Sequence, residues 1–253
     1  MIRFENASIG YHEPILKALN LTIKKGGIHV IVGPNGCGKT TMMKGILTPS
    51  MVSEGKVLLA ERELNTYTLN ERAKCFAYLP QTRPIPHIHG KTLVGHGRYP
   101  YQGFLRSSTQ QDRSIVDQVM AQTQTTRFAH EYVDELSGGQ RQRVFLAMAL
   151  AQNCEWLLLD EPTTYLDFTS QLEVMQLIKT LKEQGKTILL TLHDLSQALQ
   201  LADELIVMND GRIEAQGSVD QILADHLLER VFHIRIKIFN ENEKRYPFIE
   251  AEV

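Results

Sequence analysis

The stretch Gly33-Pro34-Asn35-Gly36-Cys37-Gly38-Lys39-Thr40 decides the fold, because it matches the pattern G-x-x-x-x-G-K-[ST] in full. It follows the short apolar run Ile28–Val32 and leads into Lys39–Leu47, which has helical periodicity. A buried strand thus passes through a glycine-rich turn into a helix. In that setting the glycines let backbone N–H groups converge on phosphate oxygens at the positive end of the helix. The sequence therefore predicts a loop that holds the phosphates of a nucleotide.

The side chains of this loop have separate expected tasks. Lys39 is expected to reach the β- and γ-phosphates, and the Thr40 hydroxyl to bind Mg²⁺. Thr41 adds a hydrogen bond to the α-phosphate. Cys37 lies inside the loop, where we expect it to act as a small tolerated residue and not as an oxidation switch.

A second apolar run, Trp156–Leu159, ends in the acidic pair Asp160-Glu161. Ligands of parallel sheets bind at the carboxyl ends of the strands, so a carboxylate there is well placed for a nucleotide. Asp160 is expected to hold Mg²⁺ through water. Glu161 is expected to polarise the attacking water, which is the task of a general base.

Further apolar runs at 187–192 and 204–208 alternate with helical patterns at 169–184 and 195–202. Strands that alternate with helices indicate an α/β fold with a mostly parallel core sheet. Near the N-terminus, 3–8 and 16–23 alternate between apolar and polar residues and predict an antiparallel β-subdomain. Helical patterns at 112–125 and 138–152 predict an inserted helical subdomain.

The chain has 253 residues, which fits one large domain with an inserted lobe. We expect residues 1–83 and 153–227 to form the nucleotide-binding core and 84–152 the helical subdomain. Residues 228–253 are expected to form a short C-terminal extension, in which the alternation of 234–238 predicts a strand.

A second anion-binding feature is Leu136-Ser137-Gly138-Gly139-Gln140. Ser137 is a good helix N-cap, and the two glycines leave backbone N–H groups open at a helix N-terminus. One chain cannot easily use both anion sites on one nucleotide. Two chains can, if the phosphate loop of each faces the Ser-Gly-Gly of the other.

With these motifs in this order, nearly the whole chain resembles the ATP-binding cassette (ABC) ATPases. The resemblance makes Tyr11 the aromatic that stacks on adenine and Gln81 the glutamine that senses the γ-phosphate and the metal. Ser137–Gln140 corresponds to the signature that binds ATP in trans. Asp167 lies in the loop that links the two ATP sites of the dimer, and His193 is the switch histidine on the γ-phosphate. The family implies a P-loop NTPase fold and a homodimer that hydrolyses MgATP, with Lys39, His193 and Glu161 as the catalytic set.

Within the family, three stretches are similar to the ATPases of iron–siderophore, haem and cobalamin importers: 94–100 (VGHGRYP), 161–167 (EPTTYLD) and 192–195 (LHDL). Iron–siderophore import is the first choice, with haem or cobalamin import as alternatives. A different alternative is a soluble cassette ATPase that drives assembly, as in iron–sulfur cluster biogenesis.

A transport function implies partners: ATP, a second copy of the chain, polytopic membrane permease subunits and, indirectly, a substrate-binding protein. We expect residues 84–106, which are rich in Pro, Gly, His and Tyr, to receive a coupling helix of the permease. Charge reversal at Arg98 should then uncouple transport and leave basal ATPase activity largely intact.

The net charge of −2 argues against nucleic acid as the main partner. Three scattered cysteines, no signal peptide and no run of about 18–20 apolar residues indicate a peripheral protein on the cytoplasmic face of the inner or plasma membrane. His87 and His89 lie among prolines with no carboxylate or cysteine partner in view, so we expect no metal site there.

Overall fold

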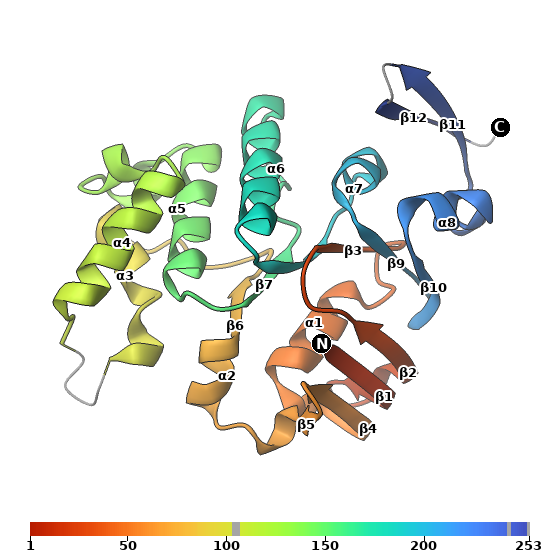
Figure 1. The fold of residues 1–253 in the computed structure, drawn as a ribbon, viewed down its shortest axis with the longest axis horizontal. Coiled ribbons are helices and arrows are strands. Elements are labelled where there is room, and N and C mark those ends of the chain that lie inside the picture. The colour runs from red at the N-terminus through yellow and green to blue at the C-terminus, as the bar shows by residue number, and fades with distance from the viewer. Residues whose placement is uncertain (103–106, 242–243, 252–253) are drawn as a thin grey trace. The chain divides into compact units, whose positions relative to one another are not determined.

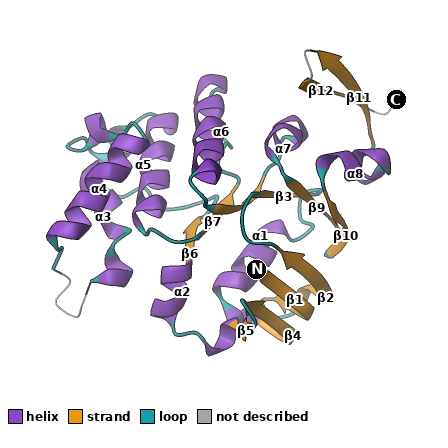
Figure 2. Cartoon of the chain, viewed as in Figure 1, coloured by secondary structure: helices purple, strands orange, loops and turns teal. Residues whose placement is uncertain are grey.

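The computed structural model describes residues 1–102, 107–241 and 244–251. The chain packs into two compact units: an end unit of residues 1–66 and 187–253, and a middle unit of residues 67–186. The elements of each unit are labelled in Figure 1 and coloured by type in Figure 2. The expected helical subdomain, 84–152, lies within the middle unit.

The end unit begins with an antiparallel sheet in the order β2-β1-β4-β5. Its strands are β1 (Ile2–Gly10), β2 (Pro14–Ile23), β4 (Val52–Leu59) and β5 (Arg62–Glu63). Leu19, Leu21 and Ile23 recur along β2 with period two and are buried, as expected for a sheet with one solvated face, and Leu16 is buried on the other side of a register shift. The predicted antiparallel β-subdomain is confirmed.

The same unit contains strand β3 (Ile28–Val32), which precedes the glycine-rich loop and is flanked in parallel by β8 (Thr187–Thr191) and β9 (Glu204–Asn209). All five residues of β3 and of β8 are buried, which explains why apolar residues do not alternate with exposed polar ones along these strands. The antiparallel strand β10 (Arg212–Gly217) extends the sheet beyond β9.

The remaining elements of the end unit are mostly helical. They are α1 (Lys39–Leu47), η1 (Pro49–Met51), η2 (Leu64–Thr66), α7 (Leu195–Leu201), α8 (Val219–Ala224), α9 (Leu227–Phe232) and the hairpin β11 (Ile234–Glu241) with β12 (Lys244–Ala251). The strand predicted from the alternation of 234–238 is the first half of β11.

The middle unit holds one parallel strand pair and a group of helices. The pair is β6 (Phe76–Leu79) with β7 (Trp156–Asp160). The helices are α2 (Leu69–Cys75), α3 (Gly90–His96), η3 (Tyr99–Tyr101), α4 (Gln110–Gln122), η4 (Thr126–Phe128), η5 (Val133–Glu135), α5 (Gly138–Ala151) and α6 (Phe168–Glu183). In Figure 1, α3, α4 and α5 lie side by side, and these three helices contact one another. The α/β fold class with parallel core strands, an antiparallel β-subdomain and a helical part is confirmed.

Side-chain caps set where several of these helices begin. Thr68, Thr109, Ser137 and Ser218 each form a capping box with the residue three positions on. Among the helices in the described part of the chain, none is long and apolar enough to span a bilayer.

Arg98, the residue chosen to test coupling, is buried in the middle unit. Only 5% of the residue is exposed; Nε donates to Asp112 Oδ1 at 2.9 Å and Nη1 to the Ala151 carbonyl at 2.8 Å. The guanidinium also lies 4.0 Å from the ring centroid of Tyr101. A carboxylate at this position would face Asp112 in the interior, so we expect charge reversal to destabilise the middle unit instead of acting on coupling alone. Of the expected coupling segment, residues 103–106 lie outside the described residues.

Candidate nucleotide-binding site

The phosphate loop of the end unit is shaped by glycines that admit no side chain. A Cβ on Gly33 would lie 2.2 Å from the Met208 carbonyl oxygen, and one on Gly38 would lie 2.3 Å from Leu16 Cδ2. Gly36 has a φ of +80° with open space around it, so its backbone is free to face a ligand.

The Lys39 side chain is hydrogen-bonded to the backbone of the phosphate loop itself. Only 8% of the residue is exposed, and its Nζ donates to the carbonyl oxygens of Gly33 at 2.8 Å and Pro34 at 3.0 Å. The N-cap of α1 is Gly38, which supplies no side-chain hydrogen bond, so the first-turn amides of this helix remain for a ligand. A buried ammonium and uncapped amides at one loop make a cradle for an anion such as the phosphates of ATP.

The neighbouring side chains of the loop are small or solvated. Cys37 is buried, and burial raises the pKa of its thiol, so it stays protonated at neutral pH. Thr41 is buried and Thr40 half-buried at the start of α1, while Asn35 is exposed.

Tyr11 lies in the turn between β1 and β2 with 61% of its surface exposed. Its hydroxyl accepts a hydrogen bond from Lys44 Nζ on α1 at 3.1 Å, and the same Nζ lies 5.7 Å from the ring centroid. The contact keeps Tyr11 beside the helix that follows the phosphate loop and leaves most of the residue accessible to a base.

His193 comes two residues after β8, and the next residue, Asp194, caps α7 by accepting from Ser196 N at 2.7 Å. His193 is exposed and shares a cavity of about 320 Å³ with Gly33, Pro34 and Asn35. Within the end unit, the structure thus brings the predicted switch histidine to the phosphate loop.

In the middle unit, the acidic pair meets the predicted glutamine. Asp160 ends β7, is 2% exposed and accepts from the Tyr78 hydroxyl at 3.4 Å. Glu161 follows with a φ of +48°, and its Oε2 accepts from Gln81 Nε2 at 2.7 Å and from Thr164 Oγ1 at 2.8 Å. The parallel pairing of β6 with β7 brings Gln81, Asp160 and Glu161 to the same edge.

Sequence analysis missed two residues that donate hydrogen bonds to the acidic pair: Tyr78 donates to Asp160 and Thr164 to Glu161. Tyr78 pairs in register with Leu158, so its approach to Asp160 depends on a strand pairing that no local pattern displays. Thr164 lies three residues after Glu161, a spacing within reach of a turn, and that proximity was a usable signal.

The Ser-Gly-Gly motif opens α5. Ser137 Oγ accepts from Gln140 N at 3.4 Å, and Gln140 Oε1 accepts from Ser137 N at 3.0 Å. A Cβ on Gly138 would meet nothing closer than 3.8 Å, whereas one on Gly139 would lie 2.1 Å from Ser170 Oγ on α6. Gly139 is therefore required for packing against α6, and Gly138 is the exposed one.

Asp167 caps α6. Its Oδ1 accepts from Ser170 N at 3.0 Å and its Oδ2 from Ser170 Oγ at 2.8 Å, and these bonds hold the pKa of this carboxyl below its ordinary value. The linking loop and the Ser-Gly-Gly motif are thus neighbours on one unit, joined through Ser170.

His87 departs from expectation. Its Nδ1 lies 2.9 Å from Asp134 Oδ2, and its ring stacks on Tyr132 with the centroids 4.1 Å apart. The expectation that it lacks a carboxylate partner is therefore wrong, because the bridge between His89 and Tyr132 brings Asp134, 47 residues along the chain, beside it.

A loop with a buried lysine at a helix N-terminus, and an acidic pair at a parallel strand end, are the two parts of a P-loop ATPase. The family model "ABC transporter" matches residues 16–164, and this chain belongs to that family as an ATP-hydrolysing, ATP-binding component.

Relatives extend the match to nearly the whole chain. The iron(3+)-hydroxamate import ATP-binding protein FhuC of Bacillus subtilis is 38% identical, over 96% of this chain and 91% of the relative. The achromobactin transport ATP-binding protein CbrD of Dickeya dadantii is 41% identical, over 91% of this chain and 87% of the relative.

Solved structures of ABC transporters and their cassettes are similar to this chain in fold. A metal-chelate type ABC transporter in an inward-facing conformation matches with a TM-score of 0.84 at 26% identity, over 98% of this chain and 95% of that one. A dimeric ATP-binding cassette in a post-hydrolysis state with ADP and phosphate matches with a TM-score of 0.76 at 30% identity, over 87% and 99%.

Proposed function

We propose that this chain is the ATP-hydrolysing subunit of an importer for iron–siderophore-type substrates. The observation that carries the proposal is the identity of 36–41% that it shares, over at least 91% of its length, with relatives named for hydroxamate, achromobactin, siderophore, petrobactin and enterobactin transport. The chain would work as a homodimer at the cytoplasmic face of the membrane, beneath separate permease subunits.

In this proposal, the chain binds MgATP through the predicted site residues. Tyr11 stacks on the base, the amides of 33–41 hold the phosphates, and Lys39 neutralises the β- and γ-phosphates. The donor set fits a hard cation with oxygen ligands: the Thr40 hydroxyl, the Gln81 amide oxygen and the Asp160 carboxylate. When bound, Mg²⁺ would supply charge neutralisation between the β- and γ-phosphates.

Glu161 is the proposed general base. Hydrogen bonds from Gln81 and Thr164 already orient its carboxylate, which then takes a proton from the attacking water. His193 stabilises the charge that develops on the γ-phosphate. Ser137–Gln140 of a second copy closes the site, and loss of the γ-phosphate removes the group that bridges the two copies, so the dimer opens.

Uptake by the host organism tests the substrate. A strain that lacks this chain should lose uptake of ⁵⁵Fe-labelled siderophore, and a plasmid copy should restore it, whereas the Glu161→Gln copy should not. Haem and cobalamin uptake in the same strain are the controls. Loss of either of these with siderophore uptake intact would reassign the substrate.

A pull-down tests the transport function itself. The tagged chain, recovered from solubilised membranes of its host, should carry a polytopic membrane subunit in stoichiometric amount. Recovery of soluble assembly factors alone would leave the ATPase standing and overturn transport.

A further inference from the structure

The cavity beside the phosphate loop has an apolar wall that the ATPase function does not use. Its lining comprises Gly33, Pro34, Asn35 and His193 together with four apolar side chains, Leu195, Phe232, Ile234 and Ile249. These four apolar side chains come from α7, α9 and the two strands of the C-terminal hairpin. The end of the chain thus builds half of a cavity of about 320 Å³ that opens next to the phosphate loop.

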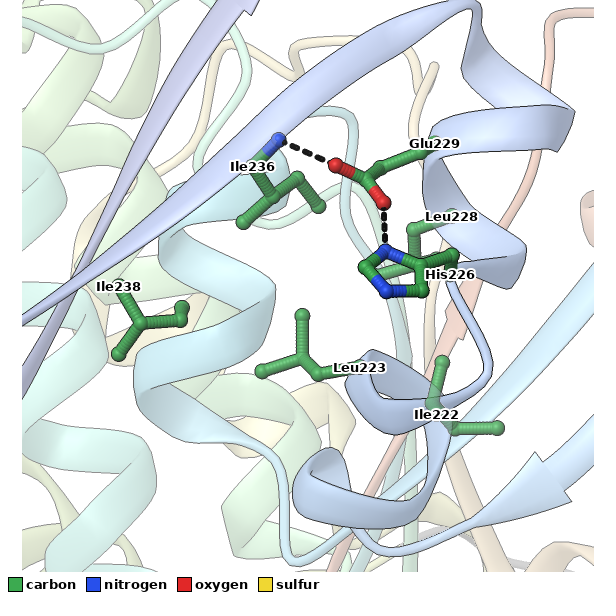
Figure 3. Close-up of a pocket in the computed structure, with 7 residues that line it drawn as sticks. All are labelled: Ile222, Leu223, His226, Leu228, Glu229, Ile236 and Ile238. Atoms are coloured by element: carbon green, nitrogen blue, oxygen red, sulfur yellow. Dashed lines mark hydrogen bonds and ion pairs between the residues drawn. The ribbon is translucent and has the colours of Figure 1, made fainter.

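Specific contacts hold this wall in place. Figure 3 shows Glu229 of α9 accepting a hydrogen bond from the Ile236 backbone, at 2.9 Å, and pairing with His226. Leu228 is buried beneath, and β12 packs on α7. The hairpin is therefore attached to α7 and α9.

The middle unit carries a matching apolar projection. Tyr165 is 93% exposed, Phe168 74% and Leu172 49%, all in the linking loop and the first turns of α6. Phe168 and Leu172 are four residues apart, so they lie on one face of the helix. Large apolar side chains exposed in one place mark an interaction surface.

This projection borders the Ser-Gly-Gly motif. The nearest atom to a Cβ built on Gly138 is the Tyr165 carbonyl oxygen, and Gly139 packs on Ser170, two residues after Phe168. Tyr165 also holds a φ of +63°, which is unfavourable for a bulky residue. Any second chain whose nucleotide meets this motif also meets the aromatic side chains beside it.

We propose that Phe168 of one copy inserts into the cavity lined by Phe232, Ile234 and Ile249 of a second copy, with Tyr165 and Leu172 at its rim. The inference rests on the proposed function, in which each phosphate loop faces the Ser-Gly-Gly of the other copy, and it names a contact beyond the nucleotide. An apolar cavity of roughly 150 Å³ already holds a benzene molecule, so this one accommodates a phenyl ring with room for its neighbours. The C-terminal hairpin thereby becomes part of the dimer interface.

Dimer affinity tests the contact. In a Glu161→Gln background with MgATP, sedimentation velocity should show that Phe168→Ser weakens the dimer by about tenfold or more, as truncation of a buried aromatic anchor does. The matched control is Leu69→Ser, because Leu69 is also the first residue of a capped helix and is 76% exposed. Equal dissociation constants for the two variants would overturn the proposal.

Cross-linking tests the partner residues independently. Phe168→Cys with Ile249→Cys should give a covalent dimer on oxidation in the presence of ATP, and either single variant should give much less. A double variant that forms no interchain disulfide while its dimer persists overturns the proposal. ATP affinity of each variant, measured on monomer, checks that the fold is intact.

The two proposals fail in different ways. If the Glu161→Gln parent does not dimerise with ATP, the head-to-tail mechanism falls and the cavity contact falls with it. If the parent dimerises and Phe168→Ser behaves as Leu69→Ser does, the mechanism stands and only the cavity contact is lost.

Discussion

At the scale of single residues, Glu161 combines an unusual backbone with a prepared side chain. Its φ of +48° is uncommon for a residue other than glycine, and such conformations persist where the surroundings determine them. Here the preceding residue ends a buried strand, and two side chains donate to the carboxylate. The backbone conformation and the two hydrogen bonds together fix the position of Oε2. A fixed carboxylate oxygen is suited to orienting a water molecule.

Glu161→Gln should retain ATP binding and lower turnover by about 10²–10⁴-fold, because the amide cannot accept the proton of the attacking water. Because ATP is not hydrolysed in this variant, the ATP-bound dimer should also accumulate. Steady-state ATPase assays and sedimentation measure the two effects. Glu183→Gln, an exposed change at the end of α6, is the matched control and should hydrolyse at the parental rate. Near-parental turnover in Glu161→Gln would remove this residue from the catalytic role.

At the scale of elements, the ion pair of Arg98 with Asp112 fastens the helical part of the middle unit. Arg98 follows α3, Asp112 lies in the first turn of α4, and the Ala151 carbonyl ends α5, so one guanidinium joins three helices. Both side chains are 6% exposed. Asp112 also completes the capping box of α4 with Thr109, so its carboxylate has fixed partners on two sides.

Arg98→Met should lower the free energy of unfolding by about 3–5 kcal/mol, because it leaves a buried carboxylate without its counter-ion. Urea denaturation measures the change. Lys91→Met removes the exposed partner of Asp117 in the same pair of helices and should cost less than about 1 kcal/mol. An equal loss in the free energy of unfolding for the two variants would show that the buried Arg98–Asp112 pair stabilises the fold no more than an exposed pair does.

The same pair gives stability a pH dependence with a definite sign. Burial raises the pKa of the Asp112 carboxyl, but the bonds from Arg98 and Thr109 outweigh it, and the pKa lies below its ordinary value. A depressed carboxyl pKa stabilises the fold above the pKa of the unfolded chain, and that stabilisation is lost as pH falls through the folded-state pKa. The stability difference between parent and Arg98→Met should therefore be constant near neutral pH and shrink in acid.

At the scale of the whole molecule, the proposed ligands of MgATP come from distant parts of the sequence. Lys39 and Thr40 belong to the end unit, and Asp160 and Glu161 to the middle unit. A ligand that binds only the folded chain stabilises it, by an amount set by its affinity and concentration.

MgATP at about 100 times its dissociation constant should raise the Tm by about 5–10 °C. Differential scanning fluorimetry measures the shift. Excess EDTA, or Asp160→Asn, should remove the magnesium-dependent part of it, whereas the exposed change Asp117→Asn should not. A shift in Asp160→Asn that still depends fully on magnesium would argue against Asp160 as a ligand.

The sequence by itself determined the features that are local along the chain. The phosphate loop is eight consecutive residues, and β3 and α1 follow from the apolar run before it and the helical pattern after it. Ser137, Asp167 and Asp194 are caps whose partners lie two or three residues away. The order of the motifs indicated the family, and the family model confirmed it.

Only the tertiary structure decided the contacts between residues far apart. Gln81 and Glu161 are 80 positions apart and meet because β6 and β7 pair in one register. Arg98 was chosen from its sequence context as a probe of coupling, but it is buried, and its burial depends on helices that start 12 and 40 residues later. The apolar cavity beside His193 exists because the C-terminal hairpin packs on α7. Long-range packing selects such partners by shape and burial, and no periodicity in the sequence records that choice.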